Sequence, residues 1–155
     1  MATPTRALRM NPHWAEEILS GRKDLELRSS NTQIRGRISL SCGKYLVGEV
    51  NIINSFLIAY KGDDGLWVDV VPGQSFEELK VRHRVNDDLS LIKGYKKLWA
   101  WELSDPIKYD NPKEFDPPHG AVVWVDLVKA RSRIIRSPEQ RIRRVKPPRG
   151  KSGGS

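Results

Sequence analysis

The chain has 155 residues, 38% of them hydrophobic and 30% charged, with a formal net charge of +8, as suits one folded domain with polar extensions. A single cysteine, Cys42, excludes an intramolecular disulfide and a cysteine-based zinc cage. The longest apolar run is far short of the roughly 20 residues that cross a bilayer, and the N-terminus lacks a signal-peptide stretch. We therefore expect a monomeric, intracellular and cytoplasmic protein without membrane contact.

The chain opens with a predicted strand and helix. Residues 5–10 alternate weakly between polar and apolar side chains, which predicts a short strand. Asn11 and Pro12 supply an N-cap and a first helical position, and Gly21 supplies a stop. The pattern predicts a helix over residues 12–20.

Three strands are predicted next. Residues 23–28 alternate between charged and apolar side chains, as in a half-buried strand with one charged face. Residues 35–42 place apolar side chains at every second position, and residues 45–57 are rich in Val and Ile. Gly48 interrupts the last of these runs and indicates a bulge.

The second half of the chain adds a helix and two strands. A turn is predicted at residues 61–65, and Ser75 followed by Glu78 forms a capping box that predicts a helix over residues 76–84. Residues 97–103 alternate again, and Ser104 to Pro106 should end that strand. The last strand is predicted over residues 121–128. Three tryptophans, Trp99, Trp101 and Trp124, are predicted to lie in the core. Short strands with two helices indicate an α+β, mainly β, domain or small barrel.

The positive charge is concentrated at the C-terminal end. Residues 129–151 contain ten basic residues and one acidic residue, whereas the rest of the chain contains 17 basic and 18 acidic residues. We therefore predict a domain over residues 1–128 and a flexible basic tail over 129–155, typical of proteins that bind nucleic acid. The predicted phosphate contacts are Arg131, Arg133, Arg136, Arg141, Arg143, Arg144 and Lys146. The alternative is a solubilising end without a partner.

The segment G-R-K-D-L-E-L-R at residues 21–28 carries the most chemistry. On a strand, Glu26 and Arg28 leave the same face roughly 6.6 Å apart, and Lys23 can reach that face from the preceding turn. A guanidinium suits a phosphate or a base edge, whereas a carboxylate can accept from an amino group or act as a general base. The three residues are therefore a candidate ligand site. The alternative is a local ion-pair network that stiffens the strand.

Two further residues are candidates for the same ligand. Arg35 beside Gly36 extends a path for phosphate, and Trp14 is placed to stack on a base, although its helical spacing with Ile18 also fits a core position. The histidines are scattered without metal-ligand spacing, and the chain has no glycine-rich phosphate loop. We therefore expect neither a metal ion nor a cofactor.

The same segment has the form G-x-K-x-x-E-x-R and resembles the signature of ASCH-domain proteins, a branch of the PUA-like superfamily. Its surroundings are similar too, with P-H-W-A-E-E-I-L-S-G before it and R-G-R-I-S-L, L-W-A-W-E-L-S-D-P and P-P-H-G-A-V-V-W after it. The resemblance covers most of residues 5–128. It implies a small PUA-like β-barrel with about two short helices that binds nucleic acid, RNA in preference to DNA, in a cleft containing Lys23, Glu26 and Arg28.

The resemblance leaves two other functions open. Some similar proteins are ribonucleases, and a related group are amidohydrolases that deacylate a modified cytidine with a threonine nucleophile at the position of Glu26. Because this chain has Glu there, that mechanism does not transfer, but Lys23 and Glu26 are candidate catalytic residues for acid-base cleavage of RNA. A protein-interaction adaptor is the third class that the resemblance allows.

Overall fold

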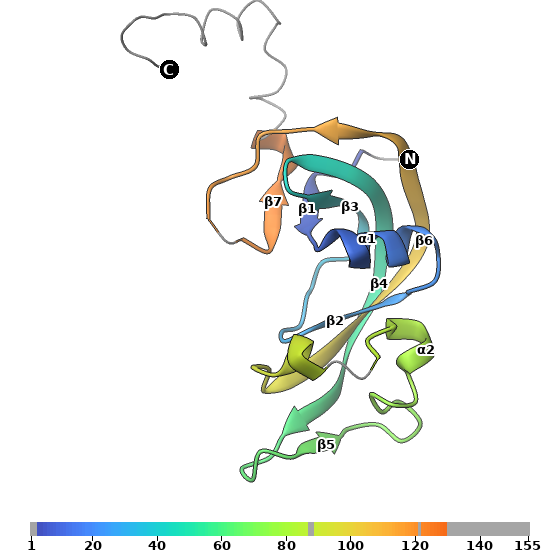
Figure 1. Cartoon of the computed structure of the whole chain (residues 1–155), viewed down its shortest axis with the longest axis vertical. Coiled ribbons are helices and arrows are strands. Elements are labelled where there is room, and N and C mark those ends of the chain that lie inside the picture. Colours follow the sequence, from blue (N-terminus) through green and yellow to red (C-terminus); the bar gives the residue numbers. More distant parts are fainter. Residues whose placement is uncertain (1–2, 87–88, 121, 130–155) are drawn as a thin grey trace, which may run out of the picture.

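A computed structural model describes residues 3–86, 89–120 and 122–129. The elements follow one another along the chain as labelled in Figure 1. They are β1 (Arg6–Arg9), α1 (Pro12–Leu19), β2 (Leu25–Arg28), β3 (Gly36–Cys42), β4 (Tyr45–Lys61), β5 (Trp67–Asp69), α2 (Lys80–His83), the 3-10 helix η1 (Leu89–Ile92), β6 (Lys97–Glu114) and β7 (Trp124–Asp126). None of the described helices is long and apolar enough to span a membrane.

The strands form one mixed sheet in the order β2-β6-β4-β3-β1-β7, with β5 added to β4. Among the described strands, only β1 and β3 pair in parallel. The two long strands β4 and β6, of 17 and 18 residues, pair along most of their length and run through the whole molecule (Figure 1). The α+β, mainly β, class is therefore confirmed. Among the described residues the hydrogen-bonded order runs from β2 to β7 without a pairing that joins these two ends, so the predicted barrel closure stays a prediction.

The helix α1 packs its apolar face onto the curved part of the sheet. Asn11 caps its N-terminus through a 2.8 Å hydrogen bond to the His13 amide, and Pro12 is its first residue, as predicted. Its buried residues Ala15, Ile18 and Leu19 join a core cluster with strand residues that include Trp101. Trp101 is buried as predicted, whereas Trp99 and Trp124 are half-buried and pack against that cluster.

The predicted helix over residues 76–84 is wrong in length, because α2 covers only Lys80–His83. The capping box does form, with hydrogen bonds of 3.0 and 3.1 Å between Ser75 and Glu78. A continuous helix would use the Phe76 carbonyl for the amide four residues later. That carbonyl instead accepts from Nε2 of the His83 ring at 2.7 Å, and the left-handed Arg84 ends the helix. The His83 side chain therefore takes the place of the backbone amide that would bind the Phe76 carbonyl oxygen in a continuous helix.

The strand predicted to stop at Ser104 continues as β6 to Glu114. The stop signal acts as a local irregularity instead, since the partner register jumps between the Asn51↔Ser104 and Glu49↔Ile107 pairs. Asp105, with a φ of 52°, and Pro106 lie in this jump and have no partner residue in β4. Proline, which has no N–H group, is tolerated at such an unpaired position. At the other end, β7 covers only Trp124–Asp126 of the predicted strand 121–128.

The bulge predicted at Gly48 is confirmed, because β4 pairs Gly48 with Leu40 and Leu46 with Ser41, which leaves Val47 as the extra residue. A Cβ atom on Gly48 would lie 2.5 Å from the Leu19 side chain and 2.6 Å from the Ile107 carbonyl oxygen. The missing side chain therefore lets α1 approach the sheet.

We expect Gly48→Ala to lower the free energy of unfolding by about 1–3 kcal/mol, because the added methyl group must displace Leu19 or the β6 backbone. Urea denaturation measures the change. Gly94→Ala is the matched control, since its Cβ atom would meet nothing within 4 Å. Equal stability of the two variants would show that α1 has room to move away from the sheet.

Candidate functional site

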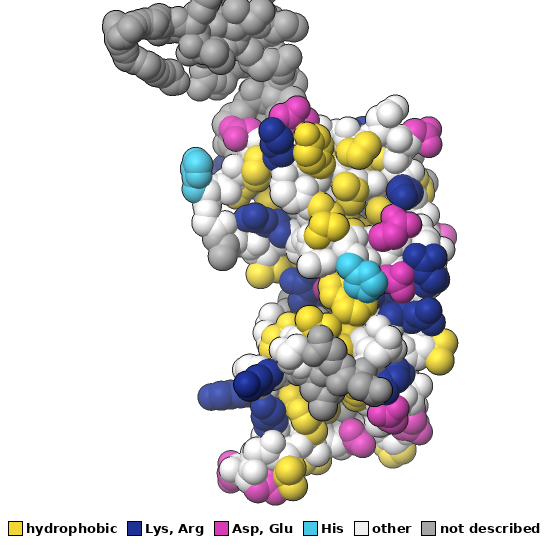
Figure 2. Space-filling model, in the orientation of Figure 1, with side chains coloured by type: hydrophobic (Ala, Val, Ile, Leu, Met, Phe, Trp, Pro, Cys, Tyr) yellow, Lys and Arg dark blue, Asp and Glu magenta, His cyan; other side chains and the backbone are white. Residues whose placement is uncertain are grey.

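A cavity of about 260 Å³ opens where α1 faces β2 and the segment around η1. In Figure 2 the outline of the molecule is indented on the left, between its upper and lower halves. The cavity is lined by Arg9, Met10, Asn11, Trp14, Lys23, Glu26, Leu27, Arg28, Val85, Leu91, Ile92 and Tyr95. Two parts of the chain that are distant in the sequence, residues 9–28 and residues 85–95, therefore build one site.

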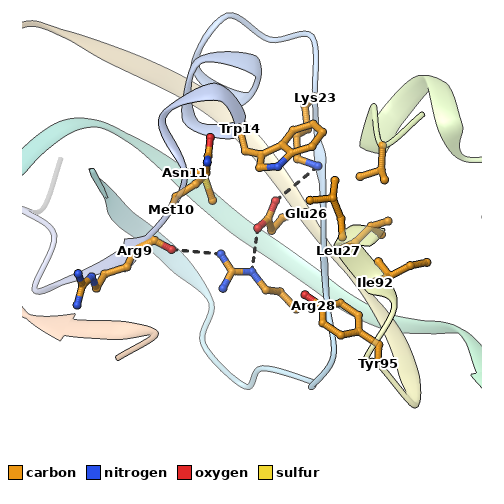
Figure 3. Close-up of a pocket in the computed structure, with 12 residues that line it drawn as sticks. Arg9, Met10, Asn11, Trp14, Lys23, Glu26, Leu27, Arg28, Ile92 and Tyr95 are labelled. Atoms are coloured by element: carbon orange, nitrogen blue, oxygen red, sulfur yellow. Dashed lines mark hydrogen bonds and ion pairs between the residues drawn. The ribbon is translucent and has the colours of Figure 1, made fainter. Parts of the chain in front are cut away.

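Three charged side chains meet in this cavity (Figure 3). The Glu26 carboxylate lies between two cations, with Lys23 Nζ 3.5 Å from its Oε1 atom and Arg28 Nε 2.8 Å from its Oε2 atom. Alternation along β2 places Glu26 and Arg28 on the face opposite Leu25 and Leu27. The cluster contains two positive charges and one negative charge. Because its net charge is positive, it favours an electron-rich or anionic ligand.

The ammonium group of Lys23 is buried, with only 2% of the residue exposed. Its Nζ atom donates to the His83 carbonyl oxygen at 2.6 Å and lies 4.6 Å from the centre of the Trp14 ring. Burial lowers the pKa of Lys23, and the nearby Glu26 carboxylate opposes that effect. Because a buried cation needs such partners, Lys23 fixes the positions of the groups around it.

Arg28 is held on two other sides. Its Nη2 atom donates to the Arg9 carbonyl oxygen at 3.3 Å, and its guanidinium carbon lies 5.5 Å from the centre of the Trp101 ring. The Trp101 ring is fixed in turn, since its Nε1 atom donates to the Ser30 carbonyl oxygen at 3.0 Å. Among the residues that the structure describes, Nη1 of Arg28 has no hydrogen-bond acceptor. This guanidinium is therefore prepositioned and still has donors for a ligand.

The helix α2 is attached to the start of β2 by a second charge cluster. Arg82 binds both carboxylate oxygens of Asp24, at 2.8 and 3.1 Å, and also binds Glu102 at 2.9 Å. The backbone joins too, because the Asp24 amide donates to the Arg82 carbonyl oxygen at 3.0 Å. These contacts place the next residue, His83, where its carbonyl oxygen reaches Lys23.

The structure brings together four of the residues predicted to bind ligand, Lys23, Glu26, Arg28 and Trp14. Trp14 both lines the cavity and packs against the second core cluster, so the two roles considered for it are compatible. Arg35 is not among the lining residues, and its Nη1 atom donates to the carbonyl oxygens of Thr32 and Ile34 at 2.9 and 2.8 Å. The predicted phosphate contacts from Arg131 to Lys146 lie outside the described residues.

Sequence reasoning missed several residues of this site. Arg9 and Met10 lie at the end of β1 and directly after it. Ile92 and Tyr95 lie in a segment for which no helix or strand was predicted. The run K-G-Y-K-K at 93–97 is the one signal in that segment, since an aromatic residue lies among lysines. His83, which carries the acceptor for Lys23, had no sequence signal.

The His83 ring predicts a pH dependence of stability. The ring is fully buried; Nε2 donates to the Phe76 carbonyl oxygen and Nδ1 accepts from the Val85 amide at 2.9 Å, so both nitrogens are used by the neutral form. Burial lowers the pKa of His83 below its ordinary value of about 6.5. Below that pH the unfolded chain takes up a proton that the folded protein does not, so stability should fall as pH drops.

As the pH is lowered below 6.5, we expect the free energy of unfolding of the wild type to decrease relative to that of His83→Gln, by up to about 1.4 kcal/mol per pH unit. The decline should end at the lowered pKa of the folded protein. Urea titrations between pH 7.5 and pH 5 measure this difference, with the exposed His119→Gln as the control that should follow the wild type. A difference between wild type and His83→Gln that is constant with pH would contradict the neutral buried ring.

No protein-family model and no curated protein matches this chain. Solved structures do match. A crystal structure of ASCH from Zymomonas mobilis is 16% identical, with 70% of this chain and 72% of that chain covered and a TM-score of 0.53. A Tyr-to-Phe variant of the Zymomonas mobilis protein is 18% identical, with 84% and 94% covered and a TM-score of 0.58. A Ser-to-Ala variant is also 18% identical, with 86% and 96% covered and a TM-score of 0.55.

These similarities agree with the mixed sheet described above. At such low identity they concern the architecture and not the ligand. The chain therefore has the fold of an ASCH domain.

Proposed function

We propose that this protein is a nucleic-acid-binding module that takes an unpaired base of RNA into the cavity beside β2. The observation that carries the proposal is the Glu26–Arg28 pair on the floor of a cavity with an aromatic wall. A volume of about 260 Å³ is slightly below the roughly 300 Å³ at which small-molecule sites start. The cavity therefore suits one base or nucleoside and excludes a double helix.

The side chains match what base recognition needs. Arg28 has donors for a carbonyl or ring nitrogen, the Glu26 carboxylate can accept from an exocyclic amino group, and Trp14 offers a ring for stacking. RNA is favoured over DNA because sequence-specific RNA recognition mainly uses unpaired bases that stack on aromatic side chains and bond along their edges. In this proposal the sheet closes as a PUA-like β-barrel within a domain of residues 1–128, the protein is an intracellular monomer, and the basic tail contacts phosphates.

Hydrolysis of RNA is the second candidate function, favoured by the 3.5 Å approach of Lys23 to Glu26. In that reaction Glu26 would accept the proton of a 2′-hydroxyl as its oxygen attacks the neighbouring phosphorus, and Lys23 or Arg28 would stabilise the developing charge. The bond from phosphorus to the 5′-oxygen would break, and that oxygen would take a proton from water, which leaves a cyclic phosphate for water to hydrolyse. Both carboxylate oxygens already face a cation, and each keeps a second lone pair that can accept from an amino group or a hydroxyl. This geometry is compatible with either function.

The cavity is tested with single-stranded RNA oligonucleotides. We expect Arg28→Ala to weaken binding by about 1–3 kcal/mol, because a charge-assisted contact to the base is lost, while Glu26→Gln keeps most of the affinity. The matched control is Arg22→Ala, which removes an exposed arginine paired with Glu17 outside the cavity. Fluorescence anisotropy measures binding, and thermal melting verifies that each variant is folded.

The same samples distinguish the two functions. If the protein is a nuclease, the oligonucleotide is cut, and Glu26→Gln reduces turnover by on the order of a hundredfold while binding stays nearly constant. Equal affinities of Arg28→Ala, Glu26→Gln and Arg22→Ala, without cleavage, would show that the charged cluster is only structural.

A separate experiment tests the tail. Removal of residues 131–155 should leave the melting temperature unchanged and reduce the salt dependence of RNA binding. If about five of its basic side chains touch a single strand, the slope of log K against log salt should fall by about 3.5. An unchanged slope would show that the tail does not contact the ligand, and a large loss of melting temperature would show that it belongs to the domain.

A further inference from the structure

Three exposed lysines lie next to cavity-lining residues in the chain. The segment at residues 93–97 reads K-G-Y-K-K, in which Lys93 follows the lining residue Ile92, and Lys96 and Lys97 follow the half-buried lining residue Tyr95. Within the part of the chain that the structure describes, none of these three lysines forms an ion pair with an acidic side chain. Their positive charge is therefore available to a ligand.

The backbone of this segment is held in place from behind. Nζ of Lys61 donates to the Lys93 carbonyl oxygen at 3.0 Å, and the Lys61 amide donates to the Lys96 carbonyl oxygen at 2.8 Å. The Tyr95 amide also donates to the carbonyl oxygen of Ile92, another residue of the cavity wall, at 3.0 Å. The lysines therefore extend from an anchored segment whose position relative to the cavity is set by the fold.

The opposite wall of the cavity is basic as well. Arg9 and Arg28 line it from β1 and β2, and Glu26 is the one acidic residue among the described lining residues. Trp14 and Tyr95 lie on opposite sides of the Glu26–Arg28 pair (Figure 3). A cavity with aromatic and charged walls, followed in the chain by three lysines without a described ion pair, combines the two features by which proteins bind single strands, a stacking surface and a cationic track.

We propose that Lys93, Lys96 and Lys97 bind the phosphates on either side of the base in the cavity, so that the ligand is a single strand. The inference rests on the function proposed above and adds to it the position of the backbone. A base that stacks beside Tyr95 brings its own sugar and phosphate to the rim formed by that segment. A duplex is excluded as the preferred ligand, because a paired base cannot enter the cavity.

The test uses the full-length protein with a labelled single-stranded RNA of mixed sequence and with the same strand in a duplex, at four salt concentrations. We expect the triple variant K93Q/K96Q/K97Q to bind the single strand more weakly and to lower the slope of log K against log salt by about 2, since each lost phosphate contact lowers it by about 0.7. We also expect the wild type to bind the duplex at least tenfold more weakly than the single strand.

The matched control is K44Q/K108Q/K113Q, which removes the same charge from lysines outside the segment at residues 93–97 and should leave the slope near that of the wild type. If K93Q/K96Q/K97Q and the control give the same slope while Arg28→Ala still weakens binding, the phosphate site is wrong and the base cavity stands. Equal affinity for single strand and duplex would overturn the single-strand inference. If the wild type binds neither RNA, the proposed function itself fails.

Discussion

The site depends on the burial of a single ammonium group. Lys23 lies at the turn between α1 and β2, and its Nζ atom contacts the Glu26 carboxylate, the His83 carbonyl oxygen and the Trp14 ring. These partners belong to β2, α2 and α1, so satisfying one buried cation fixes three segments relative to each other. A buried lysine without them would be strongly destabilising, and this requirement makes the cavity walls mutually dependent.

The same constraint decides how α2 folds. Its first turn is not helical because the Phe76 carbonyl accepts from the His83 ring, and this interaction directs the His83 carbonyl oxygen toward Lys23. Arg82 adds the ion pairs that hold α2 against Asp24. The capping box favours a regular helix, but the site uses a short one. Its segment leaves the Phe76 carbonyl oxygen to the His83 ring and the His83 carbonyl oxygen to Lys23.

The sheet contributes the shape around this cluster. Its two long strands β4 and β6 deviate from a regular ladder at several points, among them the bulge beside Gly48 and the jump at Asp105. Bulges bend a strand and increase its twist, and Gly48 also lets Leu19 of α1 come close to the sheet. The curved sheet brings the end of β1 near β2, and the Arg9 carbonyl oxygen thereby reaches Arg28.

The sequence by itself determined the local elements with strong signals. Asn11, Pro12 and Gly21 defined α1, alternation defined the central strands, and the spacing of Glu26 and Arg28 placed both on one face of β2. Such features depend on neighbouring residues, whose geometry is fixed by the period of a helix or a strand. The resemblance of residues 21–28 to a known signature then indicated the fold.

Only the tertiary structure decided which distant groups complete the site. His83 and Tyr95 are far from β2 in the sequence, and their contribution depends on how α2 and η1 pack against it. The length of α2 was likewise set by the hydrogen bond between His83 and Phe76, seven residues earlier, and the continuation of β6 past Pro106 by its pairing with β4. Local patterns could not predict these features, because the hydrogen bonds and burial that decide them form between segments brought together by folding.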